Sequence, residues 1–482
     1  MAAHPAAKPT ASSKAPLAVD LDGTLMRGDL FGESMLRLVF AKPWKIPLLI
    51  AWLLKGRAYA KARLVQLAPF DPTELPYNEH FLAWLRQERA EGRTIVLATA
   101  SDRRAADVVA AHVGVFDAVF ASDGVTNLKS RRKAEHLARA FPEGFAYAGN
   151  EIADLKVWAR ASQAVVVNAP RWLSDHAHRK FAVEQSFAPQ TNALVALLTA
   201  LRPQQWAKNI LVFLPLLAGQ GWLDTAAWRE AAIAFLALCC AASSVYLLND
   251  AADIDADRRH PRKRRRPFAD GAISPFVGLA VAALLCIEAF VLSWGVHVAG
   301  FIALYLVVST LYTFWLKRVV LIDVFLLAAL YTLRVVLGGA ASGYVASSWL
   351  LAFSTFFFLS LALMKRVVEV RALQAVGSAT LARRGYHVAD GPVLTMMGVG
   401  ASFVSALVLA LYTQSETVLS HYHAPLALWA LPLLTVFWMC RVWLKTARGE
   451  MTDDPLVFAF RDRASLAIGA LAAAAFAYAA LG

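Results

Sequence analysis

The chain has 482 residues, of which 58% are hydrophobic and 17% are charged, and its formal net charge is +13. The apolar residues are concentrated in the second half, which is not the composition of a wholly water-soluble protein. The positive charge does not indicate nucleic acid binding, because much of it lies in the loops between apolar segments. The four cysteines all lie inside apolar runs without metal-site spacing, so we expect them to be buried.

The first 14 residues are rich in Ala, Pro and Ser, and we expect them to form a disordered tail. They lack the apolar core of a signal peptide, which predicts a cytoplasmic amino terminus. Over residues 15–187, short apolar runs alternate with helical segments, as in an α/β domain with a parallel sheet. The expected strands are residues 17–20, 94–99, 118–121, 145–149 and 164–168.

The first of these strands ends in D-L-D-G-T-L, which contains Asp20 and Asp22. Two carboxylates at the carboxyl end of a parallel strand lie where open α/β sheets bind ligands. Three further motifs follow in chain order: V-L-A-T-A-S with Thr99, a lysine at Lys133 or Lys129, and G-N-E-I-A-D with Asn150 and Asp154.

Together these four motifs resemble the haloacid dehalogenase-like phosphatases, which have a Rossmann-like α/β fold. The resemblance covers residues 15–187, with a helical cap inserted at about 29–91. Within this cap, residues 43–55 are apolar with cationic ends, and the segment is too short to span a bilayer. It either packs inside the cap or lies against the membrane surface.

The resemblance implies that Asp20 is the nucleophile and that Asp22 protonates the leaving alcohol. It also implies that Thr99 and Lys133 hold the phosphoryl oxygens, and that Asp20, Asp22, Asn150 and Asp154 hold magnesium. Asn150 departs from the family, which usually has Asp there. An amide oxygen brings no charge, so we expect weaker metal binding, and a catalytically inactive, regulatory domain is the alternative.

After a linker at 188–203, the chain from 204 to 482 contains nine apolar stretches that are long enough, or nearly so, to cross a bilayer. Their approximate ranges are 204–220, 228–248, 275–296, 298–315, 319–338, 347–365, 393–413, 425–443 and 464–481.

The segments that connect these stretches alternate in charge. Most Lys and Arg residues of this half lie at 249–274, 316–318, 366–392 and 444–463. By the positive-inside rule these segments are cytoplasmic, which predicts an inner-membrane protein with its carboxyl terminus on the outer side.

A cluster of carboxylates follows the second apolar stretch, in N-D-A-A-D-I-D-A-D at 249–257. Asp250, Asp253 and Asp257 are spaced i, i+3 and i+7, so they share one face if a helix continues through them, with Asp255 turned away. Their repulsion is relieved most easily by a divalent cation. The basic run that ends at Arg266 offers cations for phosphate oxygens, so the segment predicts a magnesium-diphosphate site.

This acidic motif, together with L-K-R-x-x-x-x-D ending at Asp323, resembles the UbiA-type prenyltransferase superfamily, a nine-helix all-α membrane bundle. Four blocks narrow the resemblance to the polyprenyl-phosphate (decaprenyl-phosphate) phosphoribosyltransferase branch. They are L-R-P-Q-Q-W-A-K-N at 201–209, D-R-R-H-P-R-K-R-R-R-P at 257–267, A-L-M-K-R-x-x-E at 362–369 and R-G-E-M-T-D-D-P-L-V-F-A-F-R-D-R at 448–463. The second acidic motif lacks an Asp at position 327, so a second metal is absent or weakly held.

The resemblance implies transfer of 5-phosphoribose from phosphoribosyl diphosphate to a membrane-borne polyprenyl phosphate. From the pairing of the two sets of motifs in one chain, we hypothesise that the amino-terminal domain then removes the 5-phosphate. The implied magnesium ligands are Asn249, Asp250, Asp253, Asp257 and Asp323, of which Asp250, Asp253 and Asp257 are also assigned to catalysis. The implied substrate-binding residues are Lys208, Asn209, Arg264, Arg265, Arg266, Lys317, Arg334 and Lys365.

Two other interpretations compete. The acidic motifs also suit an aromatic prenyltransferase whose phosphatase-like domain is regulatory or inactive. A non-enzymatic membrane scaffold leaves the aligned carboxylates without a reason. The isoprenoid length, the final glycolipid and the oligomeric state, a homo-oligomer included, stay open.

Overall fold

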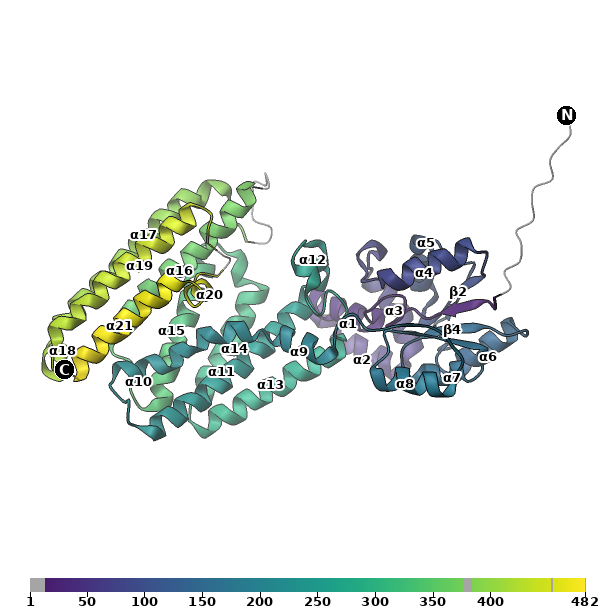
Figure 1. Cartoon of the computed structure of the whole chain (residues 1–482), viewed down its shortest axis with the longest axis horizontal. Helices are drawn as coiled ribbons and strands as arrows, with labels where there is room; N and C mark the ends of the chain where they lie inside the picture. The colour runs from purple at the N-terminus through teal and green to yellow at the C-terminus, as the bar shows by residue number, and fades with distance from the viewer. Residues whose placement is uncertain (1–13, 376–383, 452–453, 482) are drawn as a thin grey trace, which may run out of the picture. The chain divides into compact units, whose positions relative to one another are not determined.

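The computed structural model describes residues 14–375, 384–451 and 454–481. The predicted disordered tail therefore lies, apart from Lys14, outside the described residues. The chain divides into two compact units, Met1–Leu201 with Leu247–Val281, and Arg202–Tyr246 with Ala282–Gly482. Figure 1 shows the course of the chain. The domain boundaries drawn from the sequence stay predictions.

The first unit is built on a six-stranded sheet in the order β3-β2-β1-β4-β5-β6, and every neighbouring pair is parallel. This is a doubly wound strand order, and it confirms the predicted α/β class. The central strands are continuous apolar runs because both faces of such a sheet are covered. The strands are β1 Leu17–Val19, β2 Ile95–Asp102, β3 Ala118–Ser122, β4 Ala146–Gly149, β5 Gln163–Val167 and β6 Val183–Phe187.

Strand β6 was not among the expected strands. Its sequence, V-E-Q-S-F, is short and largely polar, so it lacks the apolar run that marks the others. The helices that follow the strands are α5 Arg103–Val113, α6 Arg131–Ala140, α7 Leu155–Trp158, α8 Arg171–Lys180 and α9 Ala193–Leu201.

The segment between β1 and β2 forms the helices α1 Leu30–Ala41, α2 Ile46–Lys55, α3 Arg57–Leu67 and α4 Glu79–Ala90, with a short 3-10 turn, η2, at Pro72–Glu74. Helix α2 contains most of the apolar cap segment. Leu49 and Trp52 are buried, whereas Trp44 is 72% and Leu54 is 85% exposed. One side of the segment therefore packs within the unit, and contact of its other side with a membrane stays a prediction.

The acidic segment departs from the single helix that its spacing predicted. Helix α11, Thr225–Ala252, ends one residue before Asp253, and α12, Ile254–Arg259, begins one residue after it. Asp253 has φ −101° and ψ 12°, outside regular helical values. The N–H groups of Asp253 and Asp257 still donate to the carbonyls four residues earlier, at 3.0 and 2.8 Å. The carboxylates therefore lie on two helices that are separated by one residue, Asp253, and not on one continuous helix.

The described residues of the second unit form α-helices and short 3-10 helices. The remaining elements are η4 Pro203–Phe213, α10 Leu214–Ala218, α13 Pro275–Gly295, α14 Ala299–Phe314, η6 Leu316–Arg318, α15 Ile322–Ser342, α16 Ser348–Ala375, α17 Gly391–Thr413, α18 Glu416–His421, η8 Pro425–Trp429, α19 Ala430–Ala447, α20 Pro455–Ala459 and α21 Arg463–Leu481. In Figure 1, α16, α17, α19 and α21 run side by side.

Seven helical segments of the described residues are long and apolar enough to cross a membrane: Thr225–Ala252, Pro275–Gly295, Ile322–Ser342, Ser348–Gln374, Val388–Thr413, Pro425–Ala447 and Arg463–Leu481. The nine predicted spans are therefore not confirmed. Helix α14 has 16 residues, which is about 24 Å at a helical rise of roughly 1.5 Å per residue. The first expected span is divided between η4 and the five-residue α10.

Helices α15 and α16 and the 3-10 helix η4 pack against one another around a buried apolar cluster that includes Val335, Leu363 and Met364. The approach of η4 to α15 requires glycine at Gly338, because a Cβ atom there would lie 1.9 Å from the carbonyl oxygen of Val212. This close backbone contact places Lys208 and Asn209, both on η4, beside α15.

Candidate active sites

In the first unit, a chain of polar contacts lies at the carboxyl edge of the sheet. Asp20 follows β1, and its Oδ1 atom lies 2.9 Å from the ammonium of Lys133. That ammonium also donates to the hydroxyl of Tyr147 at 2.8 Å, and the hydroxyl donates to Asp154 Oδ1 at 2.8 Å. All four side chains are buried. Of the two candidate lysines, Lys133 is the one that reaches Asp20, whereas Lys129 pairs with Glu151 at 3.2 Å.

Asp22 lies beside this chain and is held by two donors. The N–H of Leu30 donates to Oδ1 at 2.9 Å, and the hydroxyl of Ser101 donates to Oδ2 at 2.8 Å. Burial raises the pKa of Asp22 to about 7, and the nearby charge of Asp29 acts in the same direction. A carboxyl group that holds its proton near neutral pH suits the role of a general acid.

The other predicted residues of this edge come from the neighbouring strands. Thr99, on β2, is buried, and its Oγ1 atom accepts from the N–H of Ser101 at 3.0 Å. Asn150 follows β4, and its Oδ1 atom accepts from the hydroxyl of Thr24 at 3.2 Å. Asp154 Oδ2 accepts from the N–H groups of Asn150 and Glu151, both at 2.9 Å. Burial raises the pKa of Asp154 to about 6, and the charge of Asp20 adds to this effect.

Sequence motifs did not reveal Lys61, which enters the site from the cap helix α3. Its ammonium donates to the carbonyl of Ala100 at 2.7 Å. Burial lowers the pKa of Lys61, although the nearby carboxylates of Asp22 and Asp29 oppose the shift. No local spacing connects residue 61 to the four motifs, so only the fold could show that this cation belongs here.

In the acidic segment, two of the predicted carboxylates converge on one cation. Asp250 and Asp257 are both buried. The Nη1 atom of Arg266 lies 3.1 Å from Asp250 Oδ1 and 2.7 Å from Asp257 Oδ2. Burial raises the pKa of Asp257, against the opposing effect of Arg266. Asp255 lies on another side of α12, as its position in the spacing predicted. It pairs with Arg37, a partner that the sequence did not indicate.

The carboxylates of Asp250 and Asp257 fit a divalent cation, because a single guanidinium already reaches both. Asn249 and Asp253 are half-buried nearby in sequence. Across the described residues, no group of three or more His, Cys, Asp or Glu side chains is arranged to hold a metal ion. Arg264 and Arg265 are exposed on the short 3-10 turn η5, Lys263–Arg265, whereas Arg266 is half-buried.

In the second unit, Asp323 is fully buried at the start of α15. Its Oδ2 atom lies 2.6 Å from Arg366 Nε, and its Oδ1 atom accepts from the hydroxyl of Tyr386 at 2.5 Å. Arg366 also pairs with Glu369. The predicted metal ligand is thus engaged by Arg366, which belongs to the A-L-M-K-R-x-x-E block, and by Tyr386, which no motif identified; it would have to leave Arg366 to bind a metal.

Four of the predicted substrate-binding residues gather in the second unit around η4, α15 and α16. Lys208 forms an ion pair with Asp454, and Lys365 Nζ lies 3.9 Å from the same carboxylate. Asn209 Oδ1 accepts from Arg334 Nε at 2.9 Å. We call Lys208, Asn209, Arg334 and Lys365 the cationic cluster. Tyr331 links its two halves, because Lys208 Nζ and the guanidinium carbon of Arg334 lie 5.9 and 5.4 Å from its ring centre.

Lys317 is half-buried in the 3-10 helix η6. An apolar groove of about 720 Å³ lies along α14, α15 and α16, and its lining includes Leu304, Phe325 and Leu359. The groove uses residues of α15 such as Ala329 and Val336, and also Leu330, which lies one helical turn before Arg334.

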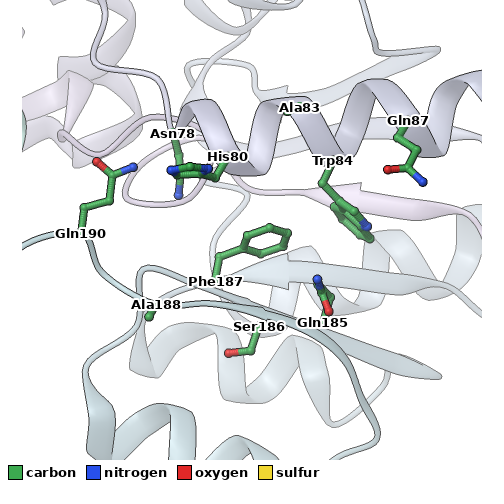
Figure 2. Close-up of a pocket in the computed structure, with 10 residues that line it drawn as sticks. All are labelled: Asn78, His80, Ala83, Trp84, Gln87, Gln185, Ser186, Phe187, Ala188 and Gln190. Atoms are coloured by element: carbon green, nitrogen blue, oxygen red, sulfur yellow. The ribbon is translucent and has the colours of Figure 1, made fainter.

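The first unit also carries a groove of about 550 Å³ between α4 and the region of β6 (Figure 2). Figure 2 shows Trp84 and Phe187 inside it, with the amides of Gln87 and Gln185 at one end. The lining contains none of the predicted site residues. This groove is therefore lined by residues other than those at the carboxyl edge of the sheet.

Residues 210–479 match the UbiA prenyltransferase family, so the chain belongs to this family. The match confirms the resemblance seen in the acidic motifs. With seven apolar helices of membrane-spanning length, the chain is an integral membrane protein.

Two relatives and one solved structure illustrate the similarity. The chain is 38% identical over 471 residues to an uncharacterized protein, y4nM, of Sinorhizobium fredii, and the match covers 96% of this chain and 90% of that protein. It is 34% identical over 212 residues to decaprenyl-phosphate phosphoribosyltransferase of Mycolicibacterium smegmatis, covering 42% of this chain and 66% of that enzyme. A UbiA homologue of Archaeoglobus fulgidus, solved with GPP and Mg2+, is 15% identical with a TM-score of 0.46, covering 59% and 98% of the two chains.

Proposed function

We propose that this chain transfers 5-phosphoribose from phosphoribosyl diphosphate to a polyprenyl phosphate, in a magnesium-dependent reaction at the cytoplasmic membrane face. We propose further that its amino-terminal domain then removes the 5-phosphate from the lipid product. One observation carries the proposal: two buried carboxylates, Asp250 and Asp257, both contact Arg266. Arg266 is the last residue of the basic run that follows the carboxylates in the sequence. The name of the mycobacterial relative supports the choice of donor and acceptor.

In the transferase reaction, an oxygen of the polyprenyl phosphate attacks C1 of the ribose. The bond from C1 to the diphosphate oxygen breaks, and diphosphate leaves. Asp250, Asp253 and Asp257, with Asn249, would hold magnesium, which supplies charge neutralisation that makes diphosphate a better leaving group. The acceptor oxygen is already anionic, so this chemistry requires no general base.

The cationic cluster suits the acceptor phosphate. Lys208, Arg334 and Lys365 bring three cations together among helices of an apolar bundle, where a charge is costly unless it is paired. Asp454 is the carboxylate that pairs with two of them. A lipid phosphate that reaches Lys208 and Lys365 would form charge-assisted hydrogen bonds to both.

In the phosphatase reaction, Asp20 attacks the phosphorus of the 5-phosphate, and the bond from phosphorus to the ribose oxygen breaks. Asp22 gives its proton to that oxygen, and water then hydrolyses the aspartyl phosphate. Lys133 lies against Asp20 and would offset the charge of the phosphoryl oxygens. Magnesium would be held by Asp20, Asp22, Asn150 and Asp154.

The test is isotope transfer with the purified full chain, magnesium and polyprenyl phosphate. Label from the ribose of phosphoribosyl diphosphate is expected to enter the lipid, and the Asp250→Ala variant is expected to lose this transfer. Label from a prenyl diphosphate entering an aromatic ring instead would favour the aromatic prenyltransferase alternative. Full lipid labelling and donor binding in Asp250→Ala would argue against a catalytic role for the acidic segment.

A further inference from the structure

We propose that helix α1 of the amino-terminal domain is a positioning element of the transferase's acidic site, because Glu33 and Arg37 hold the helix α12 that carries Asp257. The inference rests on the proposed function of that site. Neither residue belongs to the motifs that indicated phosphatase or transferase chemistry. All the contacts described below lie within the first compact unit.

Glu33 forms a bidentate ion pair with Arg258. The two guanidinium nitrogens Nη1 and Nη2 each donate to one carboxylate oxygen at 2.8 Å. Only 5% of the Arg258 side chain and 2% of the Glu33 side chain are exposed. The Nε atom of Arg258 donates to the carbonyl of Ala269 at 2.9 Å. A buried pair of this geometry is strongly directional, so it ties α12 to α1 at a defined distance.

Arg37 lies one helical turn further along α1 and makes the opposite pairing. Its Nε and Nη2 atoms donate to Asp255 Oδ2 and Oδ1, both at 2.8 Å. It also lies 3.4 Å from Glu33. In chain order each helix carries its acid before its base, Glu33 and Arg37 on α1 and Asp255 and Arg258 on α12. Opposite charges therefore pair when the two helices are read in opposite directions. A rotation or shift of α12 would bring like charges together.

Two further bidentate pairs flank these contacts. Arg259 pairs with Glu74 of η2. Arg27, in the turn after β1, pairs with Asp270 at 2.6 and 3.0 Å. Gly271 lies at φ +74°, and a Cβ atom there would approach the backbone nitrogen of Gly28 to 2.7 Å. After the basic run, the backbone at Gly271 therefore packs directly against the backbone at Gly28.

In the sequence, Asp257 lies between Asp255 and Arg258, the two residues that form ion pairs with α1. Helix α12 has six residues, which is too short for stability without outside contacts. The two ion pairs therefore set the rotation of α12 about its axis, and with it the direction in which Asp257 points toward Arg266. At the start of α1, the N–H of Leu30 donates a hydrogen bond to Asp22. The same helix thus contacts both candidate sites.

The test compares full-length Arg37→Glu and Asp255→Arg with the double variant Arg37→Glu/Asp255→Arg, which restores opposite charges. Each single variant is expected to raise the KM for phosphoribosyl diphosphate about tenfold, as for the loss of one charge-pair coupling. The KM for polyprenyl phosphate should stay unchanged. Hydrogen exchange of the amides of residues 254–259 should become faster in the single variants. The double variant should recover both values. Arg103→Glu, which breaks the exposed pair with Asp107 in the same domain, is the matched control.

Faster exchange at 254–259 without a change in donor KM would overturn the positioning role, and so would a double variant that recovers neither value. Equal effects on both KM values, or the same loss in Arg103→Glu, would show a general structural defect and would also overturn it. If the wild type transfers no ribose label, the proposed function fails. In that case hydrogen exchange still tests the α1–α12 contact, and unchanged exchange in both single variants refutes it.

Discussion

At the scale of single residues, both candidate sites are defined by which cation lies against which carboxylate. Lys133 rather than Lys129 reaches Asp20, and Arg266 rather than Arg264 or Arg265 reaches Asp257. Neighbours in the sequence thus differ in role because one faces inward and the other faces solvent. Substituting individual residues should separate the two reactions.

Removing the ammonium at Lys208 tests the cationic cluster. Lys208→Met keeps an unbranched apolar side chain but leaves Asp454 with only the more distant Lys365. We expect the KM for polyprenyl phosphate to rise about tenfold or more, because a charge-assisted hydrogen bond to phosphate is lost. Steady-state kinetics with varied lipid measure this change. Lys445→Met, which breaks a pair with Glu450 outside the cluster, is the control. An unchanged lipid KM in Lys208→Met would place the acceptor phosphate elsewhere.

Introducing a carboxylate at Asn150 tests the proposed phosphatase site. Asn150→Asp adds a negative charge at the predicted metal position, where the side chain now accepts from Thr24. The magnesium concentration for half-maximal phosphate release should fall about tenfold, since ligand charge sets the affinity for hard divalent cations. Asn192→Asp, on the exposed amino-terminal end of α9, serves as the control for added charge. The same magnesium requirement in wild type and Asn150→Asp would mean that residue 150 does not bind the metal.

At the scale of elements, the sequence predicted the features that follow from local periodicity, such as the strand ends. It did not predict the contacts between residues that are far apart in the chain. The strand ends that carry Asp20, Thr99 and Asn150 were predictable, because parallel strands place their carboxyl ends at one edge. The i, i+7 spacing predicted that Asp250 and Asp257 lie on one face, and both carboxylates contact Arg266. The break at Asp253 between α11 and α12 was not predictable, because its residues are ordinary helix formers or polar residues without Gly or Pro.

Partners that come from far along the chain could not be inferred. Tyr386 and Arg366 both reach Asp323, across 63 and 43 residues respectively. No spacing rule connects such positions. Packing of α15 against α16 brings Arg366 to Asp323, and Tyr386 reaches it from the segment before α17. The same is true of Lys61 at the carboxyl edge of the sheet and of Glu33 against Arg258, where 225 residues separate the partners.

The buried pair between Asp323 and Arg366 gives a stability prediction. Arg366→Met leaves the carboxylate of Asp323 without its guanidinium in a fully buried position, which should cost about 3–5 kcal/mol. Thermal unfolding in detergent, without magnesium, should show a lower midpoint. Asp323→Asn combined with Arg366→Met should recover part of the loss, because no buried charge is then unpaired at that point. A wild-type midpoint in Arg366→Met would contradict a structural role for the pair.

At the scale of the whole molecule, the proposed function combines two kinds of chemistry in one chain. The relative from Sinorhizobium fredii matches 96% of this chain, so the match extends through both the α/β unit and the membrane helices. The product of the proposed transferase carries the 5-phosphate that the proposed phosphatase would remove. The lipid anchors that product in the membrane that also holds the enzyme, which favours its capture before it diffuses away.

The most direct measurement follows two labels at once. Phosphoribosyl diphosphate carrying carbon label in the ribose and phosphorus label in the 5-phosphate is incubated with polyprenyl phosphate, magnesium and the full chain. The account predicts a lipid that gains the carbon label and loses the phosphorus label, and an Asp20→Asn variant whose lipid retains both. A wild-type lipid that keeps both labels indefinitely, or one that contains no ribose carbon, would contradict it.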